Sequence, residues 1–334
     1  MRYRLFGRSG LRVSELGLGT MTFGAECWGT SEKEAGDIYG AFRDRGGNFL
    51  DTANEIYSEG RSEEILGRLM VGHRDAMVLS TKYTFQAPGG ENANASGNHR
   101  KSLVRSVEAS LRRLGTDYID LLWLHAWDGV TGAEEIMRAL DDLVCQGKLL
   151  HVGICNAPAW FISRCNTLAE LRGWSPFVGI QVEYSLVERE VERELLPMAE
   201  ALGLGTAAWS PLASGILTGK YRASGPERRR LDQIALKRAS DRAVSIGDSV
   251  VRVAEKLGKS PAQVALNWLR ARKGVVPLLG ARTLAQLQDN LDCLDFELEP
   301  DVLRELDRVS AVRLGYPHDF LRQSRALSVM NHFG

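Results

Sequence analysis

Neither sign of charge dominates this chain of 334 residues, which has 42 Lys and Arg against 42 Asp and Glu. Without a basic or acidic tract, nothing in the composition favours a nucleic acid or a membrane surface as a partner. No apolar run reaches the roughly 18 residues that a transmembrane helix needs, and residues 1–6 lack the apolar core of a secretion signal. We therefore expect a cytoplasmic protein with no nucleic-acid or membrane partner.

Two common sequence patterns are also missing. The cysteines are odd in number and have no CxxC spacing, which favours reduced thiols over a disulfide framework; they are Cys27, Cys145, Cys155, Cys165 and Cys293. The dinucleotide fingerprint GxGxxG is incomplete, because Gly17-Leu18-Gly19 lacks the third glycine at its place. This absence disfavours a doubly wound open sheet, which stays as the alternative fold.

What the sequence does contain is a regular alternation of strand-like and helix-like segments. Apolar runs such as residues 118–125 are followed by amphipathic stretches such as residues 133–146. Strands that alternate with helices predict a parallel sheet, and about eight such units over this length predict an α/β fold, the (β/α)8 TIM barrel. We expect one domain over residues 1–334. It begins with a β-hairpin at residues 1–16 and ends in a tail at residues 313–334, which would be a lid, an oligomer contact or a peripheral extension.

Polar residues follow nearly every predicted strand at the point where it ends. The residues at these ends are Thr20, Asp51, Lys82, His125, Cys155 with Asn156, Gln181, Ser210 and Gly280. In a (β/α)8 barrel the carboxyl ends of the strands meet at one mouth, and chemistry takes place there. Each residue alone is weak evidence, but together they predict a polar ring at the mouth of an apolar barrel.

Three of these residues have a chemical logic with Tyr57, which lies six positions after Asp51. A free tyrosine has a pKa of about 10, and a nearby ammonium such as that of Lys82 lowers this pKa. Asp51 would hold Lys82 charged and in position, and a neutral imidazole at His125 would orient a substrate oxygen. The set predicts a general-acid site for reducing a carbonyl.

Each of the four residues also has a purely structural interpretation. Taken singly, Asp51 is a helix cap or loop carboxylate, and Lys82 is a solvated lysine. His125 is a satisfied core histidine, and Tyr57 is a loop aromatic. The placement of all four at neighbouring strand ends favours the functional interpretation over four separate structural ones.

Several segments, taken in order, are similar to those of one known family. They are residues 17–20, 51–63, 80–82, 110–125, 152–154, 181–184, 209–212, 217–221 and 280–290. The set resembles the aldo-keto reductase superfamily, and residues 209–212 resemble its bacterial and potassium-channel β-subunit-like branch. The resemblance implies a barrel closed at its base by the hairpin. It also implies bound NADP(H), no metal, and a tetrad at Asp51, Tyr57, Lys82 and His125 in which Tyr57 protonates the carbonyl oxygen as hydride reaches the carbon.

The resemblance also implies which residues contact NADP(H). The cofactor set is Thr20, Met21 and Asp51 near the ribose, Cys155, Asn156 and Gln181 near the carboxamide, Trp209 stacked on the ring, Ser210, Pro211, Leu212, Ser214 and Lys220 at the pyrophosphate, and Gly280, Arg282, Gln286 and Asn290 at the adenosine end. Two of these residues have structural alternatives. Trp209 could be barrel packing, and Gln286 could only cap a helix together with Thr283.

Three positions depart from the family pattern. The family usually has five positions from Asp to Tyr, so one residue is extra between Asp51 and Tyr57. Cys155 stands where serine is usual. Gln286 stands where many NADP-specific members have arginine, and Arg282 would compensate at the 2′-phosphate. NADP(H) therefore stays the expected cofactor, ahead of NAD(H).

The expected substrate pocket is aromatic and uncharged, which suits apolar aldehydes or ketones. It comprises Phe23, Trp28, Tyr57 and Trp127, with the tail residues Tyr316, His318 and Phe320 as further candidates. Two other functions stay open. One is a slow, cofactor-binding regulatory protein like the channel β subunits, against which His125 argues. The other is a lyase or isomerase that uses Lys82 as a Schiff-base amine.

Overall fold

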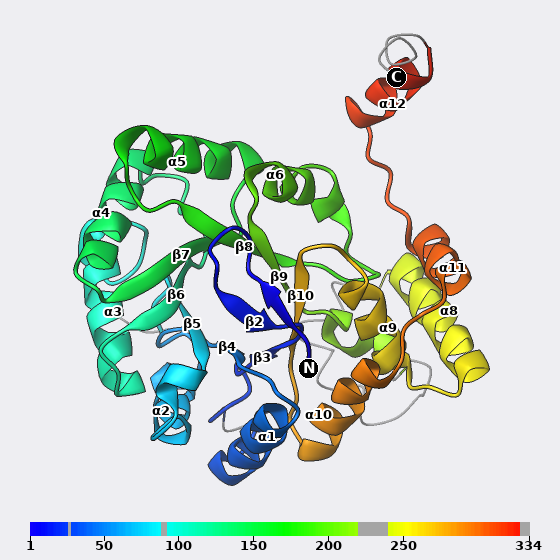
Figure 1. The fold of residues 1–334 in the computed structure, drawn as a ribbon, viewed down its shortest axis with the longest axis horizontal. Coiled ribbons are helices and arrows are strands. Elements are labelled where there is room, and N and C mark those ends of the chain that lie inside the picture. Colours follow the sequence, from blue (N-terminus) through cyan, green and yellow to red (C-terminus); the bar gives the residue numbers. More distant parts are fainter. Residues whose placement is uncertain (26–27, 88–91, 220–239, 328–334) are drawn as a thin grey trace.

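Eight parallel strands close into a barrel in the computed structural model, which describes residues 1–25, 28–87, 92–219 and 240–327, with only the backbone described for residues 324–327. The strands follow one another around the barrel in the order β10-β3-β4-β5-β6-β7-β8-β9, as Figure 1 shows. Their bounds are β3 Gly17–Gly19, β4 Phe49–Asp51, β5 Val78–Tyr83, β6 Ile119–Leu124, β7 Leu149–Cys155, β8 Phe177–Glu183, β9 Gly205–Trp209 and β10 Val275–Leu279. The predicted (β/α)8 fold is therefore confirmed.

Helices surround the barrel on its outer side (Figure 1). They are α1 Glu32–Asp44, α2 Arg61–Leu69, α3 Arg100–Leu114, α4 Ala133–Cys145, α5 Ala159–Arg172, α6 Leu195–Leu202, α8 Asp241–Leu257, α9 Pro261–Arg270, α10 Leu284–Leu291, α11 Pro300–Ser310 and α12 His318–Leu327. The side chains of Ser31, Ser260 and Thr283 accept backbone hydrogen bonds at the starts of α1, α9 and α10. Among the described residues, no helix is both long and apolar enough to cross a membrane.

The start of α2 has no side-chain cap. The position before its first residue is Gly60, and Ser62, although serine is a residue type that often caps helices, lies within the first turn. Ser62 instead lies buried and bonds to Thr20 and Thr52, with Oγ–Oγ1 distances of 2.9 and 2.8 Å. A hydroxyl that points into the barrel wall cannot also cap a helix, so Ser62 ties the β3 and β4 loops together instead.

The pleat of the strands decides which side chains point into the barrel. Successive residues of a strand alternate between two faces. On β4, Phe49 belongs to the interior cluster and Leu50 to the core under the helices, so Asp51 points inward again. The same alternation on β5 puts Val78 inside and Leu79 outside, and therefore Lys82 inside. The two charged residues thus meet within the barrel mouth.

The N-terminal hairpin covers the opposite end of the barrel. Strands β1 Tyr3–Leu5 and β2 Arg12–Ser14 pair antiparallel, as predicted for residues 1–16. Phe6 enters the barrel, where its ring centroid lies 5.7 Å from that of Phe49 and 6.1 Å from that of Trp123. A side chain at Gly179 would overlap the Phe6 ring, so this glycine makes room for the plug.

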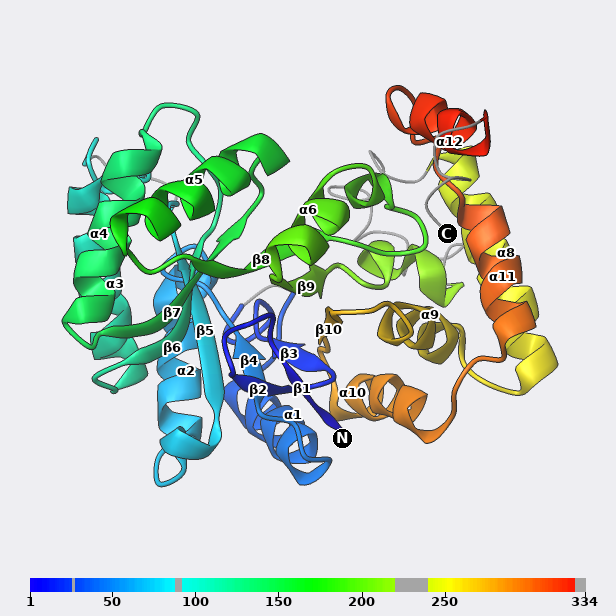
Figure 2. The ribbon, with the colours of Figure 1, turned by 45° about the horizontal axis from the view of Figure 1, so that its top comes forward.

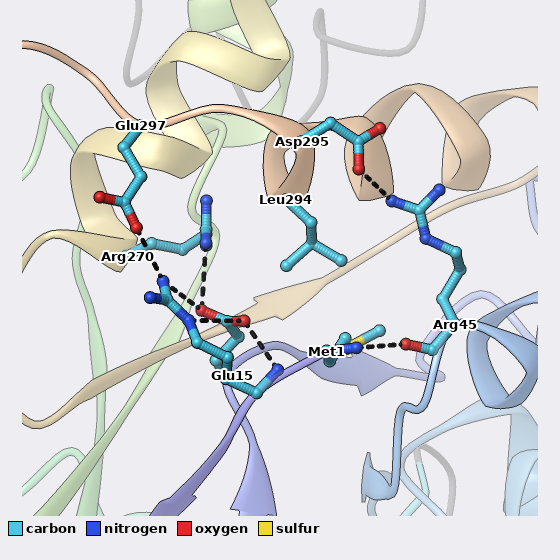
Figure 3. Close-up of a pocket in the computed structure, with 8 residues that line it drawn as sticks. Met1, Glu15, Arg45, Arg270, Leu294, Asp295 and Glu297 are labelled. Atoms are coloured by element: carbon cyan, nitrogen blue, oxygen red, sulfur yellow. Dashed lines mark hydrogen bonds and ion pairs between the residues drawn. The ribbon is translucent and has the colours of Figure 1, made fainter.

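A buried carboxylate anchors the hairpin to the barrel base. Glu15 accepts hydrogen bonds from Arg2 and Arg270 beside a pocket of about 390 Å³ (Figure 3). Its carboxylate also accepts a hydrogen bond from Arg4. Burial alone would raise the pKa of the Glu15 carboxyl, but hydrogen bonds from Arg2 and the charge of Arg270 lower it to about 2. The carboxylate is therefore ionised, and this polar pocket lies at the end of the barrel remote from the mouth.

The C-terminal tail lies at the periphery of the barrel. Helix α12 projects beyond α11, as Figures 1 and 2 both show. His318 contacts Glu194 at 3.1 Å, and the carbonyl of Arg313 accepts hydrogen bonds from Arg193. Tyr316 is 87% exposed, and Phe320 is also exposed. The expectation that Tyr316, His318 and Phe320 help to line the substrate pocket is therefore wrong for this arrangement of the chain.

Candidate active site

An ion pair forms the centre of the barrel mouth. Lys82 Nζ lies 2.5 Å from Oδ2 of Asp51 and donates a second hydrogen bond to the Thr52 carbonyl at 2.6 Å. The other carboxylate oxygen, Oδ1, accepts hydrogen bonds from Ser80 Oγ and Gln181 Nε2, both at 2.8 Å. Both charged residues are buried. A buried pair is held firmly only when its remaining polar groups are also bonded, as they are here.

The protonation state of Lys82 follows from this pair. Burial lowers the pKa of Lys82, but the adjacent Asp51 carboxylate more than compensates, and the pKa is raised overall. The lysine is therefore a permanent ammonium at neutral pH. A Schiff-base mechanism needs a neutral amine, so the charge state argues against the lyase or isomerase hypothesis.

Tyr57 lies beside this pair despite the extra residue that precedes it. Lys82 Nζ lies 5.1 Å from the centroid of the Tyr57 ring, and the rings of Tyr57 and His125 meet edge to face with centroids 6.3 Å apart. Two consecutive left-handed residues, Ser58 at φ 54° and Glu59 at φ 57°, then coil the chain into Gly60 and α2. This coil returns the chain to the barrel wall without displacing Tyr57 from Lys82.

The pKa of Tyr57 departs from the direction expected from Lys82 alone. Burial is the largest effect and raises the pKa above its usual value, while the charge of Lys82 and a hydrogen bond with it lower the pKa. The negative charge of Asp51 adds to the raising effect. The expected net lowering of the Tyr57 pKa is therefore wrong. Desolvation of the phenol raises this pKa more than the charge of Lys82, which is already paired with Asp51, lowers it. The phenol stays protonated at neutral pH, which is the form that can donate a proton.

His125 follows directly after β6 and is neutral. Burial, with a smaller effect of the Lys82 charge, lowers the pKa of the imidazole to about 3. Its Nδ1 is buried and has no hydrogen-bond partner among the described residues. Phe85 packs against the imidazole with ring centroids 4.9 Å apart. A neutral ring beside the Tyr57 phenol can hydrogen-bond an oxygen but cannot act as a strong acid.

Three residues expected at the nicotinamide amide lie at or near the carboxyl ends of β7 and β8. Asn156 adopts φ 45° after β7 and donates from Nδ2 to the His125 carbonyl at 2.9 Å. Gln181 donates a hydrogen bond from Nε2 to Asp51, so only its side-chain oxygen remains to accept a hydrogen bond from another group. Cys155 is buried inside the barrel, and burial raises the pKa of its thiol. It is therefore a neutral wall residue rather than a nucleophile.

The loop after β9 is rich in left-handed residues. Ser210, Ala213 and Ser214 have φ values of 54°, 48° and 56°, and Gly215 follows at 92°. Where a left-handed residue adjoins a right-handed one, as Ala213 adjoins Leu212, successive N–H groups can turn toward one side and make a concavity suited to phosphate. Such strain in non-glycine residues is typical of ligand-binding loops. Of the expected set here, Lys220 lies outside the described residues.

The loop before α10 carries the residues expected at the adenosine end. Thr283 Oγ1 accepts from the Gln286 N–H at 3.2 Å, and Gln286 Oε1 accepts from the Arg282 N–H at 2.9 Å. The Gln286 side chain therefore bonds within its own turn, much as the helix-capping interpretation with Thr283 would have it. Asn290 is also held locally, by the Gly280 carbonyl at 3.4 Å. The guanidinium of Arg282 is the charged group of this set.

The residues expected near the ribose and in the substrate pocket differ in how far they are buried. Thr20 is buried and bonds to Ser62, whereas Met21 is exposed at the mouth. Phe23 is 0% exposed and belongs to the main core, so its expected place in the substrate pocket is wrong. Trp28 is exposed, as expected of a mouth residue.

Sequence reasoning missed an aromatic group around Trp127. Its ring stacks on Phe161 with centroids 4.1 Å apart, and Trp160 meets both rings edge to face. The Trp127 indole donates to the Thr131 carbonyl at 3.1 Å, which fixes its orientation. Phe85, exposed beside His125, was also missed. The available signal was that each follows a predicted strand within a few residues.

Comparisons with known proteins find similar reductases and dehydrogenases. The norsolorinic acid reductase of Emericella nidulans is 39% identical over 327 residues, which cover 95% of this chain and 83% of that protein. The aryl-alcohol dehydrogenase [NADP(+)] of Phanerodontia chrysosporium is 36% identical over 92% of this chain and 86% of its own. A putative aryl-alcohol dehydrogenase of Saccharomyces cerevisiae is 33% identical over 98% and 91%.

These relatives contradict the expected branch of the family and support the family itself. They are fungal reductases and dehydrogenases, so the placement in a bacterial and potassium-channel β-subunit-like branch is wrong. A sequence model of the aldo/keto reductase family matches residues 15–311, which includes every strand of the barrel. The chain is accordingly an oxidoreductase of the carbonyl-reducing kind, and it belongs to the aldo/keto reductase family.

Proposed function

We propose that the chain is an NADP(H)-dependent reductase that converts aldehydes or ketones to alcohols. The observation that carries this proposal is the buried Lys82–Asp51 ion pair, which lies against a protonated Tyr57 and a neutral His125. A donor phenol, a fixed positive charge and a neutral hydrogen-bonding imidazole are the groups needed to stabilise an oxygen that gains negative charge.

Each residue of the tetrad then has one role. The bound cofactor supplies the hydride that adds to the carbonyl carbon. As the electron pair of the C=O double bond moves to oxygen, Tyr57 transfers its phenolic proton to that oxygen. The phenolate left behind is stabilised by the ammonium of Lys82, which Asp51 keeps in position. His125 hydrogen-bonds the carbonyl oxygen and so orients it toward Tyr57.

The fit of the mouth to NADP(H) rests on two features. The left-handed loop of Ser210, Ala213 and Ser214 suits the pyrophosphate, with Pro211 and Leu212 in the same loop. The N-terminus of α10 beside Arg282 suits the adenosine phosphate. Trp209 and Asn156 would hold the nicotinamide, with the oxygen of Gln181. The name of the Phanerodontia relative, which includes NADP(+), supports the choice over NAD(H).

The substrate that suits this mouth is an aromatic aldehyde or ketone. Trp28, Phe85 and Trp160 are exposed aromatic residues of the mouth loops, and Trp127 lies next to Trp160. Flat aromatic side chains favour a planar substrate ring through offset or edge-to-face contact. The names of the relatives, norsolorinic acid reductase and aryl-alcohol dehydrogenase, support an aryl carbonyl substrate here as well.

The proposal is tested by following NADPH absorbance with a panel of aromatic and aliphatic aldehydes. We expect turnover of the aromatic members, and loss by a factor of about 100 or more in Tyr57→Phe, which lacks the proton. NADPH binding, followed by fluorescence, should be unchanged in that variant. Tight NADPH binding without turnover of any aldehyde would instead favour the regulatory protein. Retained turnover in Tyr57→Phe would remove Tyr57 from its role as the acid.

A further inference from the structure

Asn54 lies between Asp51 and Tyr57, and every polar group of this buried residue has a partner. Its backbone N–H donates to the Lys82 carbonyl at 3.2 Å, and its backbone carbonyl accepts from the Tyr57 N–H at 3.0 Å. Its side-chain oxygen accepts from the Ile56 N–H at 3.5 Å. The residue therefore connects the strand end that carries Lys82 directly to the backbone of Tyr57.

The amide nitrogen of Asn54 connects the same loop to a second one. Nδ2 donates to the Phe85 carbonyl at 2.7 Å and to Ser106 Oγ at 3.3 Å. Phe85 in turn packs its ring against the imidazole of His125. Through one short hydrogen bond, Asn54 thus holds the loop that carries Tyr57 against the loop that contacts His125.

The loop that Asn54 holds is strained. Thr84, the residue before Phe85, has φ 126°, which a β-branched residue rarely adopts. Strained residues persist only when their surroundings hold them from several sides. Here Asn98 donates to Thr84 Oγ1 at 2.9 Å from one side, and Asn54 holds Phe85 from the other. The Asn54 bond therefore opposes relaxation of the segment that borders His125.

We propose that Asn54 is a positioning residue for Tyr57. Resting on the proposed reductase function, this assignment explains how a loop with left-handed residues at Ser58 and Glu59 keeps its tyrosine beside Lys82. The side chain of Asn54 does not touch the substrate. It holds the turn whose backbone bond fixes the start of Tyr57, so its loss should misplace the phenol rather than remove it.

The test compares Asn54→Ala and Asn54→Asp with Ser106→Ala. The alanine variant removes the amide, and the aspartate variant keeps its size but replaces the donor to Phe85 with an acceptor. We expect kcat with an aromatic aldehyde to fall about tenfold or more in both Asn54 variants, because small misplacements of reacting groups are costly. Ser106→Ala removes only the longer bond and should stay within about twofold of the parent. The Kd for NADPH and the melting temperature of the folded protein are measured for all three.

A second arm separates positioning from general damage. If Asn54 acts through Tyr57, adding Asn54→Ala to Tyr57→Phe should lower kcat little further, since the proton donor is already gone. Full additivity of the two losses would overturn the proposal, as would an Asn54 variant as active as Ser106→Ala. Absence of any turnover by the parent protein would instead count against the reductase function itself.

Discussion

The ammonium of Lys82 and the carboxylate of Asp51 lie 2.5 Å apart in the barrel mouth, and both side chains are nearly inaccessible to solvent. A buried ion pair of this kind contributes less to stability than its short distance suggests, since both ions lose their water. The effect of the ion pair at this site is to hold one positive charge beside the phenol of Tyr57, which must lose and regain a proton.

Removing one partner of this pair should destabilise the protein and abolish turnover. In Lys82→Met the Asp51 charge is left buried and unpaired, so we expect the free energy of unfolding to fall by about 3–5 kcal/mol. Urea unfolding measures this change, and NADPH consumption measures the activity. In the double variant Asp51→Asn/Lys82→Met most of the stability should return while activity stays absent. Equal destabilisation of the single and double variants would contradict a paired buried charge.

The rate of carbonyl reduction should be flat across the range in which an ordinary histidine titrates. The pKa of His125 is lowered to about 3, and that of Tyr57 is raised above its usual value. Both groups therefore keep the working form, neutral imidazole and protonated phenol, between about pH 5 and pH 9. Reduction should slow only when pH rises toward the raised pKa of Tyr57. A profile of kcat/KM against pH checks this, and a clear inflection near pH 6–7 would contradict a neutral His125.

Arg282 should decide the preference between the two nicotinamide cofactors. If its guanidinium meets the 2′-phosphate, Arg282→Ala should raise the Kd for NADPH about tenfold and leave the Kd for NADH unchanged. Lys273→Ala is a suitable control, because this exposed cation lies before β10 and pairs with Glu200 of α6. Fluorescence titration with both cofactors gives the two constants. An equal loss for NADPH and NADH would show that Arg282 does not recognise the extra phosphate.

The Glu15 carboxylate should stabilise the fold in a pH-dependent way. Glu15→Gln leaves Arg270 without its carboxylate, and we expect a loss on the order of 2–4 kcal/mol at neutral pH. The folded-state pKa of Glu15, about 2, lies below its ordinary value of 4.5, so its contribution is complete above pH 4.5 and is lost as pH falls toward 2. The difference in unfolding free energy between parent and variant should therefore narrow below pH 4.5. Turnover at pH 7 should change little, because the site lies at the opposite end of the barrel.

The sequence by itself determined the barrel and the strand ends at which Asp51, Lys82 and His125 lie. The alternation of apolar runs with amphipathic stretches is a local property, and it predicted the strand order in which Asp51, Lys82 and His125 end neighbouring strands. The two-residue period of a strand then puts Phe49 and Asp51 on one face. Neither inference needs knowledge of what lies across the barrel.

Only the tertiary structure decided how these residues are used, because burial and pairing depend on segments distant along the chain. The pKa of Tyr57 is raised by an environment that β4, β5 and the barrel wall build together. Phe23 is buried by packing that no local pattern reveals, and Ser62 bonds to two other loops instead of capping its helix. The tail lies at the periphery of the barrel, where His318 contacts Glu194, a residue more than 120 positions earlier in the chain. The bonds of Asn54 to Lys82 and Phe85 likewise join segments that are about 30 positions apart along the chain, which only folding brings together.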